Sequence, residues 1–343
     1  MKSIFNVAIV VLNWNGKDPV QKCLDSIKDQ GGKIIVVENG SVDGSLELIK
    51  EKYPFVELVV NPKNMGFAGG VNQGINIAIR ERYDFVALLN NDAVADQSWL
   101  EQLVFYMNDH PDVGIATCKL ITENKQNLDS TGENFSVWGL PFPRGRGEKV
   151  TNKYDNQTDI FGASGGASIY RVDMFKDIGL FDEDFFAYYE DVDISFRAQL
   201  KGWKVSYVPE SKAYHQIGGT SGKIKGFTVY HGAKNRLLLF YKDVPRKYFW
   251  VIGRRFILAN LLFLARAISR GQGWFAIKGY AKGLVLIPRK HKERKLIQST
   301  KKVTDEYIWS IITHDLPPGS NALNHLRNVY WRLIGKSNGQ NSN

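Results

Sequence analysis

The chain has 343 residues, enough for one large domain with an appendage or for two domains. Its two cysteines, Cys23 and Cys118, are too few for a disulfide framework and lack metal-ligand spacing, so the composition fits a reducing compartment. The net charge of +10 is unevenly distributed, because residues 222–303 hold 20 Lys and Arg against two acids and the remainder holds 25 against 33. An acidic globular part is thus joined to a basic tail, which suits contact with nucleic acid or an anionic membrane surface.

Apolar runs alternate with helical patterns in the first 95 residues. The first run breaks at Asn13 and has no small-residue cleavage site, so it predicts a strand rather than a signal peptide. Ser45 is placed to cap the second helix. Strands separated by helices of this length indicate right-handed βαβ units and a parallel sheet. The expected strands are 7–12, 33–37, 56–60 and 85–89, and the expected helices are 19–28, 46–52 and 71–82.

The fourth strand, 85–89, is a near-continuous apolar run, which is typical of a strand buried on both faces of a parallel sheet. It ends at Asn90, Asn91 and Asp92, and polar side chains at this end of a strand point into the crevice where open α/β sheets bind ligands. The carboxylate of Asp92 is a hard ligand that suits Mg²⁺ or Mn²⁺. Considered alone, the three residues are better explained by an Asx turn that ends the strand.

Polar or glycine-rich loops also follow the first three strands, and we expect them to meet at one edge of the sheet, where a nucleotide would bind. An acid after the second strand is suited to accept hydrogen bonds from a base N–H or a ribose hydroxyl. The chain has no GxGxxG after the first strand and no GxxxxGK[ST], which argues against a Rossmann dehydrogenase and a P-loop NTPase. The loop residues are Asn13 and Trp14, then Glu38, Asn39 and Asp43, then Asn64, Gly66 and Asn72.

In the segment 185–193, aromatic side chains run directly into a cluster of acids. Glu190, Asp191 and Asp193 begin an expected helix, and the helix macrodipole alone explains one or two acids in a first turn. It does not explain the aromatic residues before them, so we interpret the segment as a pocket wall with a general base. These aromatic residues are Phe185, Phe186, Tyr188 and Tyr189.

His215 is expected in a loop that follows a strand at 205–208 and precedes Gly218 and Gly219. A single histidine is usually a polar surface or core residue. Its place after a strand and before two glycines makes a metal-ligand role a reasonable second interpretation.

Together these segments resemble family 2 glycosyltransferases of the GT-A fold, an α/β fold with a Rossmann-like, mainly parallel sheet. Within that family the resemblance is to the bacterial rhamnosyltransferase-like branch. The similar segments occur in the order of the family and cover about 7–222. They are VVLNWNG, VVENGSVDGS, NMGFAGGVNQGI, LLNNDAV, GASGGASIYR, GLFDEDFFAYYEDVDISFRAQLKGW and YHQIGGTS.

The resemblance implies transfer of a sugar from a nucleotide diphosphate donor with inversion at the anomeric carbon. Asp191 takes the position of the catalytic base, with Glu190 or Asp193 as alternatives. The acids that are not the base would bind the acceptor together with Tyr189, or cap the helix. Asp92 takes the metal-binding position of the family's DxD motif, and His215 matches a histidine that can join it, so a divalent Mg²⁺ or Mn²⁺ is expected. The implied nucleotide-sugar-binding residues are Asn13, Trp14, Glu38, Asn39, Asp43, Asn64, Gly66, Asn72, Asn90 and Asn91.

Two positions depart from the family pattern. Glu38 stands where the family commonly has Asp, so its carboxylate reaches one methylene further into the base pocket. The DxD motif begins with Asn90 rather than Asp. One carboxylate, with His215, would then hold the metal, which suggests weak binding that is completed by the phosphates of the donor.

In the basic tail, residues 256–265 form an apolar stretch that is too short to span a bilayer. Aromatic residues alternate with basic ones around it, which suits helices lying in a membrane interface. The alternative is a helical cap packed on the catalytic domain with a solvated basic face, and the two can coexist. We therefore expect a GT-A domain at 1–222 and a basic amphipathic helical extension at 223–343.

The leading hypothesis is a transferase for cell-surface polysaccharide synthesis that is cytoplasmic and peripheral on the inner face of the membrane. It would use TDP-rhamnose and a glycan or lipid-linked acceptor, and a UDP- or GDP-sugar is the alternative donor. Outside enzymes, the basic tail suggests a nucleic-acid-binding protein. No RNP, helix-turn-helix or zinc-finger pattern supports that alternative, so no nucleic-acid partner is expected.

Overall fold

The computed structural model describes residues 5–216 and 224–318, and a mixed nine-stranded sheet lies at its centre. The strands β1 to β4 are mutually parallel where they pair, whereas β10 is antiparallel to both of its neighbours. A separate hairpin pairs β8 with β9. In spatial order the strands are β3 (Glu57–Val60), β2 (Lys33–Glu38), β1 (Val7–Asn13), β4 (Phe85–Asn90), β10 (Ala167–Arg171), β6 (Val113–Thr122), β11 (Lys204–His215) and β5 (Ala93–Ala95), with β7 (Leu128–Ser130) beside β6 and the hairpin β8 (Glu133–Phe135) and β9 (Pro141–Pro143) apart.

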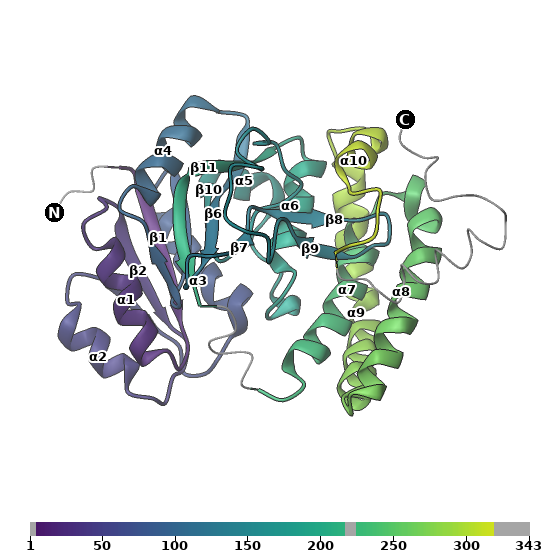
Figure 1. Cartoon of the computed structure of the whole chain (residues 1–343), viewed down its shortest axis with the longest axis horizontal. Coiled ribbons are helices and arrows are strands. Elements are labelled where there is room, and N and C mark those ends of the chain that lie inside the picture. Colours follow the sequence, from purple (N-terminus) through teal and green to yellow (C-terminus); the bar gives the residue numbers. More distant parts are fainter. Residues whose placement is uncertain (1–4, 217–223, 319–343) are drawn as a thin grey trace.

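Helices cover both faces of the sheet (Figure 1). In β1, Val7, Ile9 and Val11 belong to one hydrophobic core and Ala8 and Val10 to the other, as the two-residue period of a strand requires. Residues of α1, α2 and α4 contribute to the first core, and residues of α3, α5 and α6 to the second. These helices are α1 (Lys17–Ile27), α2 (Ser45–Lys52), α3 (Gly66–Arg80), α4 (Trp99–Asp109), α5 (Val172–Ile178) and α6 (Glu190–Leu200), with a short 3₁₀ helix η1 (Glu183–Phe185) before α6.

The carboxyl ends of β1, β2 and β4 lie together at one edge of the sheet. In the strand register Asn13 is opposite Glu38, and Leu12 is opposite Asn90. The expectation that the polar strand ends meet at one edge is therefore confirmed, as is the α/β fold class.

Two local predictions were wrong. Ser45 is the first residue of α2 rather than its cap, because its hydroxyl donates to Glu38 Oε2 (3.2 Å) and the cap position is Gly44. His215 lies at the end of β11 rather than in a loop, because the strand continues past a register shift between Val208 and Lys212. The polar residues within this bulge interrupt the alternation of apolar and polar side chains, so the sequence pattern does not predict that the strand continues.

The C-terminal region is helical, as expected, and shares a third hydrophobic core with the sheet domain. That core joins Phe135 and Phe196 to Leu238, Ile252 and Ile308. The expected boundary at 222/223 and residues 319–343 lie outside the described residues. Among the helices that are described, none combines the length and apolarity needed to cross a membrane. These elements are α7 (Phe227–Asp243), η3 (Arg246–Tyr248), α8 (Phe249–Ser269), α9 (Gly273–Ser299) and α10 (Asp305–Ile311).

Candidate active site

A cavity of about 420 Å³ opens at the edge of the sheet where β1, β2 and β4 end. The start of α6 and the end of β11 complete its wall, so the cavity collects residues from distant parts of the chain. Most of the predicted site residues meet there. They are Trp14, Asn39, Asn64, Gly66, Asn90, Asn91, Asp92, Tyr189, Glu190, Asp191 and His215.

Asn13 and Glu38 are buried and do not line the cavity. Asn13 Nδ2 donates to Glu38 Oε2 (2.7 Å), and Asn13 Oδ1 accepts from Asn91 Nδ2 (2.7 Å). The carboxylate of Glu38 also accepts from the hydroxyls of Ser41 and Ser45. Both residues therefore lie behind the cavity, where Asn13 holds the side chain of Asn91 and Glu38 holds that of Asn13.

Asp43, Asn72 and Asp193 are likewise absent from the cavity wall. Asp43 accepts hydrogen bonds from the backbone N–H groups of Lys17 (2.9 Å) and Ser45 (3.1 Å), so it joins the starts of α1 and α2. Asn72 Nδ2 and Oδ1 bond the backbone of Phe181 at 2.9 and 3.0 Å, which uses the amide to fix α3 to that segment.

For two of these residues the predicted ligand contact is wrong. Asn72 is 4% exposed and its amide is engaged with backbone, so it does not reach a diphosphate. Asp193 is fully buried and is paired with Arg197 (2.8 Å) and Lys242 (2.6 Å), so it binds no acceptor and is no candidate base. It stabilises the packing of α6 on α7.

The amides of Asn39 and Asn64 shape the start of α3. Asn39 Nδ2 donates to Asn64 Oδ1 (3.0 Å), which also accepts the backbone N–H of Gly66 (2.7 Å). Gly66 has φ +76°, and a Cβ there would lie 2.5 Å from the carbonyl oxygen of Phe186. Glycine is therefore required where α3 meets the segment before α6.

Asp92 and His215 lie together in the cavity wall. His215 Nε2 is 3.1 Å from Asp92 Oδ1, and its Nδ1 is 2.7 Å from Asp129 Oδ2. Asp129 Oδ1 in turn pairs with Arg146 Nη2 at 2.9 Å. Burial alone would lower the pKa of His215, but the hydrogen bonds to Asp129 and Asp92 outweigh it and raise the pKa to about 9.

These residues fit a divalent cation that displaces the proton on Nε2 of His215, because only the neutral imidazole binds metal. An oxygen of Asp92 and Nε2 of His215 face each other at the cavity, and O and N donors suit Mn²⁺ or, with more oxygen, Mg²⁺. The carboxylate of Asp129 bonds Nδ1 of His215 and so fixes the ring. A carboxylate at the second ring nitrogen is a usual partner of a metal-binding imidazole. Because the protein would supply only two coordinating atoms, the other coordination positions of the cation would be filled by oxygen atoms of a bound molecule.

Asp191 presents its carboxylate to the same cavity. Its Oδ2 accepts the backbone N–H of Gly165 (3.0 Å) and its Oδ1 that of Val192 (2.9 Å). Burial raises the pKa of Asp191 above its usual range, against the opposing effect of these hydrogen bonds. A fixed carboxylate with a raised pKa is suited to accept a proton from a hydroxyl near neutral pH.

A family model described as glycosyl transferase family 2 matches residues 8–179, half of the chain. The chain belongs to this family. The match includes β1 to β4 and the metal-binding candidate Asp92, and it ends before Asp191 and His215.

Curated relatives of this family 2 protein are distantly similar. A poly-β-1,6-N-acetyl-D-glucosamine synthase of Staphylococcus aureus is 23% identical over 222 residues, which cover 63% of this chain and 51% of the relative. An N-acetylglucosaminyl-diphospho-decaprenol L-rhamnosyltransferase of Mycobacterium tuberculosis is 26% identical over 214 residues, which cover 55% of this chain and 68% of the relative. The chain thus spans about half the length of the synthases that it matches.

Solved structures show the same GT-A fold. GalNAc-T7, determined with UDP, GalNAc and Mn²⁺, superposes with a TM-score of 0.56 over 72% of this chain and 49% of that one, at 15% identity. The mannosyltransferase PcManGT of Pyrobaculum calidifontis, determined with GDP-Man and Mn²⁺, has a TM-score of 0.51 over 89% and 85%, at 14% identity. The GT-A fold expected from the sequence is therefore confirmed.

Two further carboxylates of this family 2 protein share the cavity with Asp191. Glu190 is 6% exposed, and its Oε2 has no hydrogen-bond partner among the described residues. Burial, and then the charge of Asp191, raise the pKa of Glu190 and of Glu133 well above their usual range. Glu133, on the hairpin strand β8, was not predicted, because nothing in its local sequence distinguishes it from a surface acid.

The segment between η1 and α6 is held in an unusual backbone conformation. Phe186, Tyr188 and Tyr189 have φ of 65°, 72° and 69°, which are rarely adopted by side chains of this size. Asn235 Nδ2 lies 2.7–2.9 Å from the carbonyl oxygens of residues 185, 187 and 188. Lys234 Nζ donates to the carbonyl of Asp184 (2.6 Å). Helix α7 therefore supports the wall of the cavity, a role that the sequence did not reveal.

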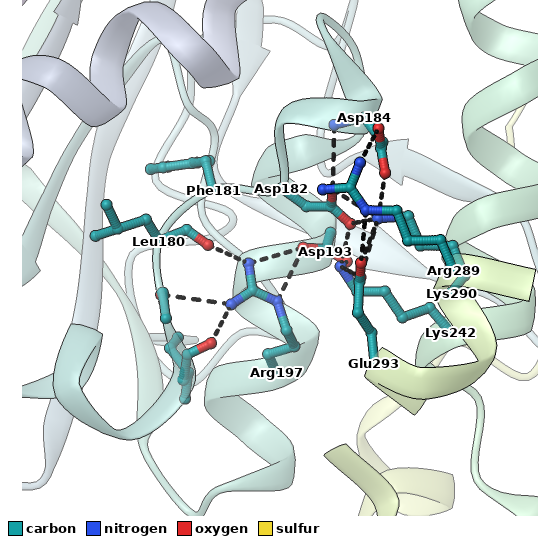
Figure 2. A network of polar contacts seen from close by, with 12 residues as sticks. Leu180, Phe181, Asp182, Asp184, Asp193, Arg197, Lys242, Arg289, Lys290 and Glu293 are labelled. Atoms are coloured by element: carbon teal, nitrogen blue, oxygen red, sulfur yellow. Dashed lines mark hydrogen bonds and ion pairs between the residues drawn. The ribbon is translucent and has the colours of Figure 1, made fainter. Parts of the chain in front are cut away.

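Asp182, Asp184 and Glu293 form a second acidic group, close enough together to hold a metal ion. A cation already lies among them, because Lys290 Nζ is 2.6 Å from Asp182, 2.9 Å from Asp184 and 2.9 Å from Glu293 (Figure 2). We therefore assign this group to an ion-pair network that joins η1 to α9, and not to the candidate metal site.

Proposed function

We propose that the protein is an inverting glycosyltransferase that moves a sugar from a nucleotide diphosphate to a hydroxyl of a glycan or a lipid-linked saccharide. The observation that carries the proposal is the carboxylate of Asp191, which has a raised pKa and shares one cavity with the candidate metal pair Asp92 and His215. Membership of family 2 supports the reaction class.

In this reaction Asp191 accepts the proton of the acceptor hydroxyl while the hydroxyl oxygen forms a bond to the anomeric carbon. The bond from that carbon to the diphosphate breaks on the opposite face, which inverts the configuration. Asp92 and His215 would hold Mg²⁺ or Mn²⁺, which offsets negative charge on a diphosphate. Asn39, Asn64 and the neighbouring polar side chains would bind the nucleotide.

Rhamnose from TDP-rhamnose is our first choice of donor sugar, supported by the mycobacterial relative that is 26% identical. UDP- and GDP-sugars are the alternatives, in keeping with the ligands of GalNAc-T7 and PcManGT. We expect the acceptor to lie at the cytoplasmic face of the cell membrane, as a step in cell-surface polysaccharide synthesis.

Thermal stabilisation by nucleotides tests the donor site. We expect one of TDP, UDP or GDP to raise the melting temperature only when Mn²⁺ is present, and Asp92→Ala to abolish the shift, because the diphosphate and the protein share the cation. NAD is the matched negative ligand.

Transfer is then measured with the sugar nucleotide that carries the stabilising base, using lipid extracts and purified glycans as acceptors. Stabilisation by no nucleotide diphosphate, with or without Mn²⁺, would contradict the proposal. Stabilisation that needs no metal and persists in Asp92→Ala would support a transferase whose donor site uses no cation.

A further inference from the structure

Exposed apolar side chains concentrate on α8 and α9. In the described part of the chain, 11 of the 18 exposed large apolar residues lie on these two helices. Single exposed apolar residues are ordinary, but a concentration on neighbouring helices marks an interaction surface. These residues are Trp250, Val251, Ile257, Leu258, Leu261, Ile268, Trp274, Ile277, Leu284, Val285 and Leu296.

Four of the six such residues on α8 form one stripe. Trp250, Ile257, Leu261 and Ile268 follow each other at intervals of 7, 4 and 7 residues, which places them within about 40° of one another around the helix. The opposite side of α8 is buried, with Ile252 in the third core. The stripe therefore points away from the body of the protein.

Helix α9 likewise has one side packed on the protein and one exposed apolar side. Gly279 and Gly283 pack closely on α7, where a Cβ at Gly279 would lie 2.3 Å from the carbonyl oxygen of Tyr230. Trp274 and Val285 are exposed at 63% and 72%. The two helices lie side by side in Figure 1, and the hydroxyl of Tyr280 on α9 donates to Asn260 on α8 (2.8 Å).

A basic groove adjoins the stripe where α7 ends and α8 begins. It has a volume of about 920 Å³ and is lined by Arg246, Arg294 and Lys295, with His291 and three aromatic residues and no acid. Arg294 Nη1 donates to the carbonyl of Val244 (2.7 Å), which holds its guanidinium in place. The groove is thus built to attract an anionic group.

Trp250 connects the two features, because it lines the groove and begins the apolar stripe. We propose that α8 and α9 form a docking surface for an anionic phospholipid bilayer, with the stripe in the interface and a lipid phosphate in the groove. Charge complementarity favours an anionic partner, since the groove is lined by Arg246, Arg294 and Lys295 and by no acid, and the exposed apolar stripe beside it favours lipid over an acidic protein. Docking would bring the active site close to a lipid-linked acceptor. That consequence rests on the proposed function, whereas the docking itself does not.

Vesicle sedimentation of the full chain tests the surface. We expect binding to phosphatidylcholine vesicles that contain phosphatidylglycerol, weaker binding to pure phosphatidylcholine, and loss of binding as salt is raised. Trp250→Ser with Leu261→Ser should weaken binding roughly tenfold or more, because both side chains leave the interface. Phe55→Ser is the matched control, since Phe55 is half-exposed on another part of the surface.

The groove is tested by Arg246→Glu with Lys295→Glu, two exposed residues whose replacement should leave the melting temperature unchanged. These changes should remove the preference for anionic vesicles. Inorganic phosphate and a short DNA duplex are the competing ligands. Phosphate or DNA binding without vesicle binding would overturn the proposal, as would unchanged vesicle binding by Trp250→Ser with Leu261→Ser. Asp191→Asn should still bind vesicles, which separates docking from failure of the proposed reaction.

Discussion

Two groups of carboxylates in this protein are both largely buried, but their pKa values are shifted in opposite directions. In the ion-pair network, burial would raise the pKa values of Asp182 and Asp193, but nearby lysine and arginine side chains hold both below the usual range. In the cavity, burial raises the pKa values of Asp191, Glu190 and Glu133. The neighbours, and not the burial, decide which acids are ionised at low pH.

The difference separates acids that stabilise the fold from acids that are available for chemistry. Asp191 and Asp193 are two residues apart on α6, so they point to different sides of the helix. One side meets the cavity and the other meets Lys242 and Arg197 (Figure 2). A local cluster of acids thus combines two roles that only the three-dimensional surroundings distinguish.

Asp191→Asn should have the largest effect on activity. Loss of the proton acceptor should lower kcat by about 10²–10⁴-fold, because general bases contribute that much, while nucleotide binding stays unchanged. Steady-state kinetics and the nucleotide thermal shift measure the two quantities. Asp173→Asn, at an exposed acid outside the cavity, is the control. Equal activity in Asp191→Asn and wild type would remove Asp191 from the reaction.

Lys242→Met should have the largest effect on stability. Lys242 is 2% exposed and pairs with Asp182 and Asp193, so its loss removes one of the two cations beside each carboxylate and leaves only Lys290 and Arg197 to offset them. Breaking a buried pair costs about 3–5 kcal/mol of unfolding free energy, measured by urea denaturation. Lys204→Met breaks a surface pair with Asp112 and should leave the midpoint nearly unchanged. Similar midpoints for the two variants would refute a structural role for the network.

Asn235→Leu tests whether α7 positions the cavity wall. We expect kcat to fall roughly 10–100-fold with little change in nucleotide affinity, because the segment 185–188 loses these hydrogen bonds and its shift displaces the carboxylates after it. Asn260→Leu is the matched control, since Asn260 is a similarly buried amide in α8 that bonds Arg236 and Tyr280 instead. If both variants lose activity equally, the effect reports general packing of the C-terminal helices.

The sheet and its polar edge were predictable because the strands of βαβ units carry continuous apolar runs and end in polar loops. The direction in which a helical side chain points could not be predicted from the sequence. Asn72 and Asp193 were assigned to ligands, but their partners Phe181 and Lys242 lie far along the chain. Glu133 reaches the cavity from a hairpin with no local pattern, and so sequence motifs could not identify it.

Glu133→Gln should have the smallest effect, and it appears only at higher pH. Glu133 faces Asp191, Asp129 and Arg146, and burial raises its pKa in the folded state. The folded protein therefore holds this proton more tightly than the unfolded chain, in which a glutamate titrates near pH ~4.3. The stabilising contribution is present below that pH and is lost as pH rises through the folded pKa.

The melting temperature of wild type should consequently fall as pH rises from 5 to 8, and Glu133→Gln should lessen the fall because glutamine stays neutral. The two proteins should agree near pH 5 and diverge toward pH 8. Some dependence on pH remains in the variant, because Glu190 and Asp243 also have raised pKa values. Parallel curves would mean that Glu133 is ionised throughout, and would place it with the paired acids of the network rather than with Asp191.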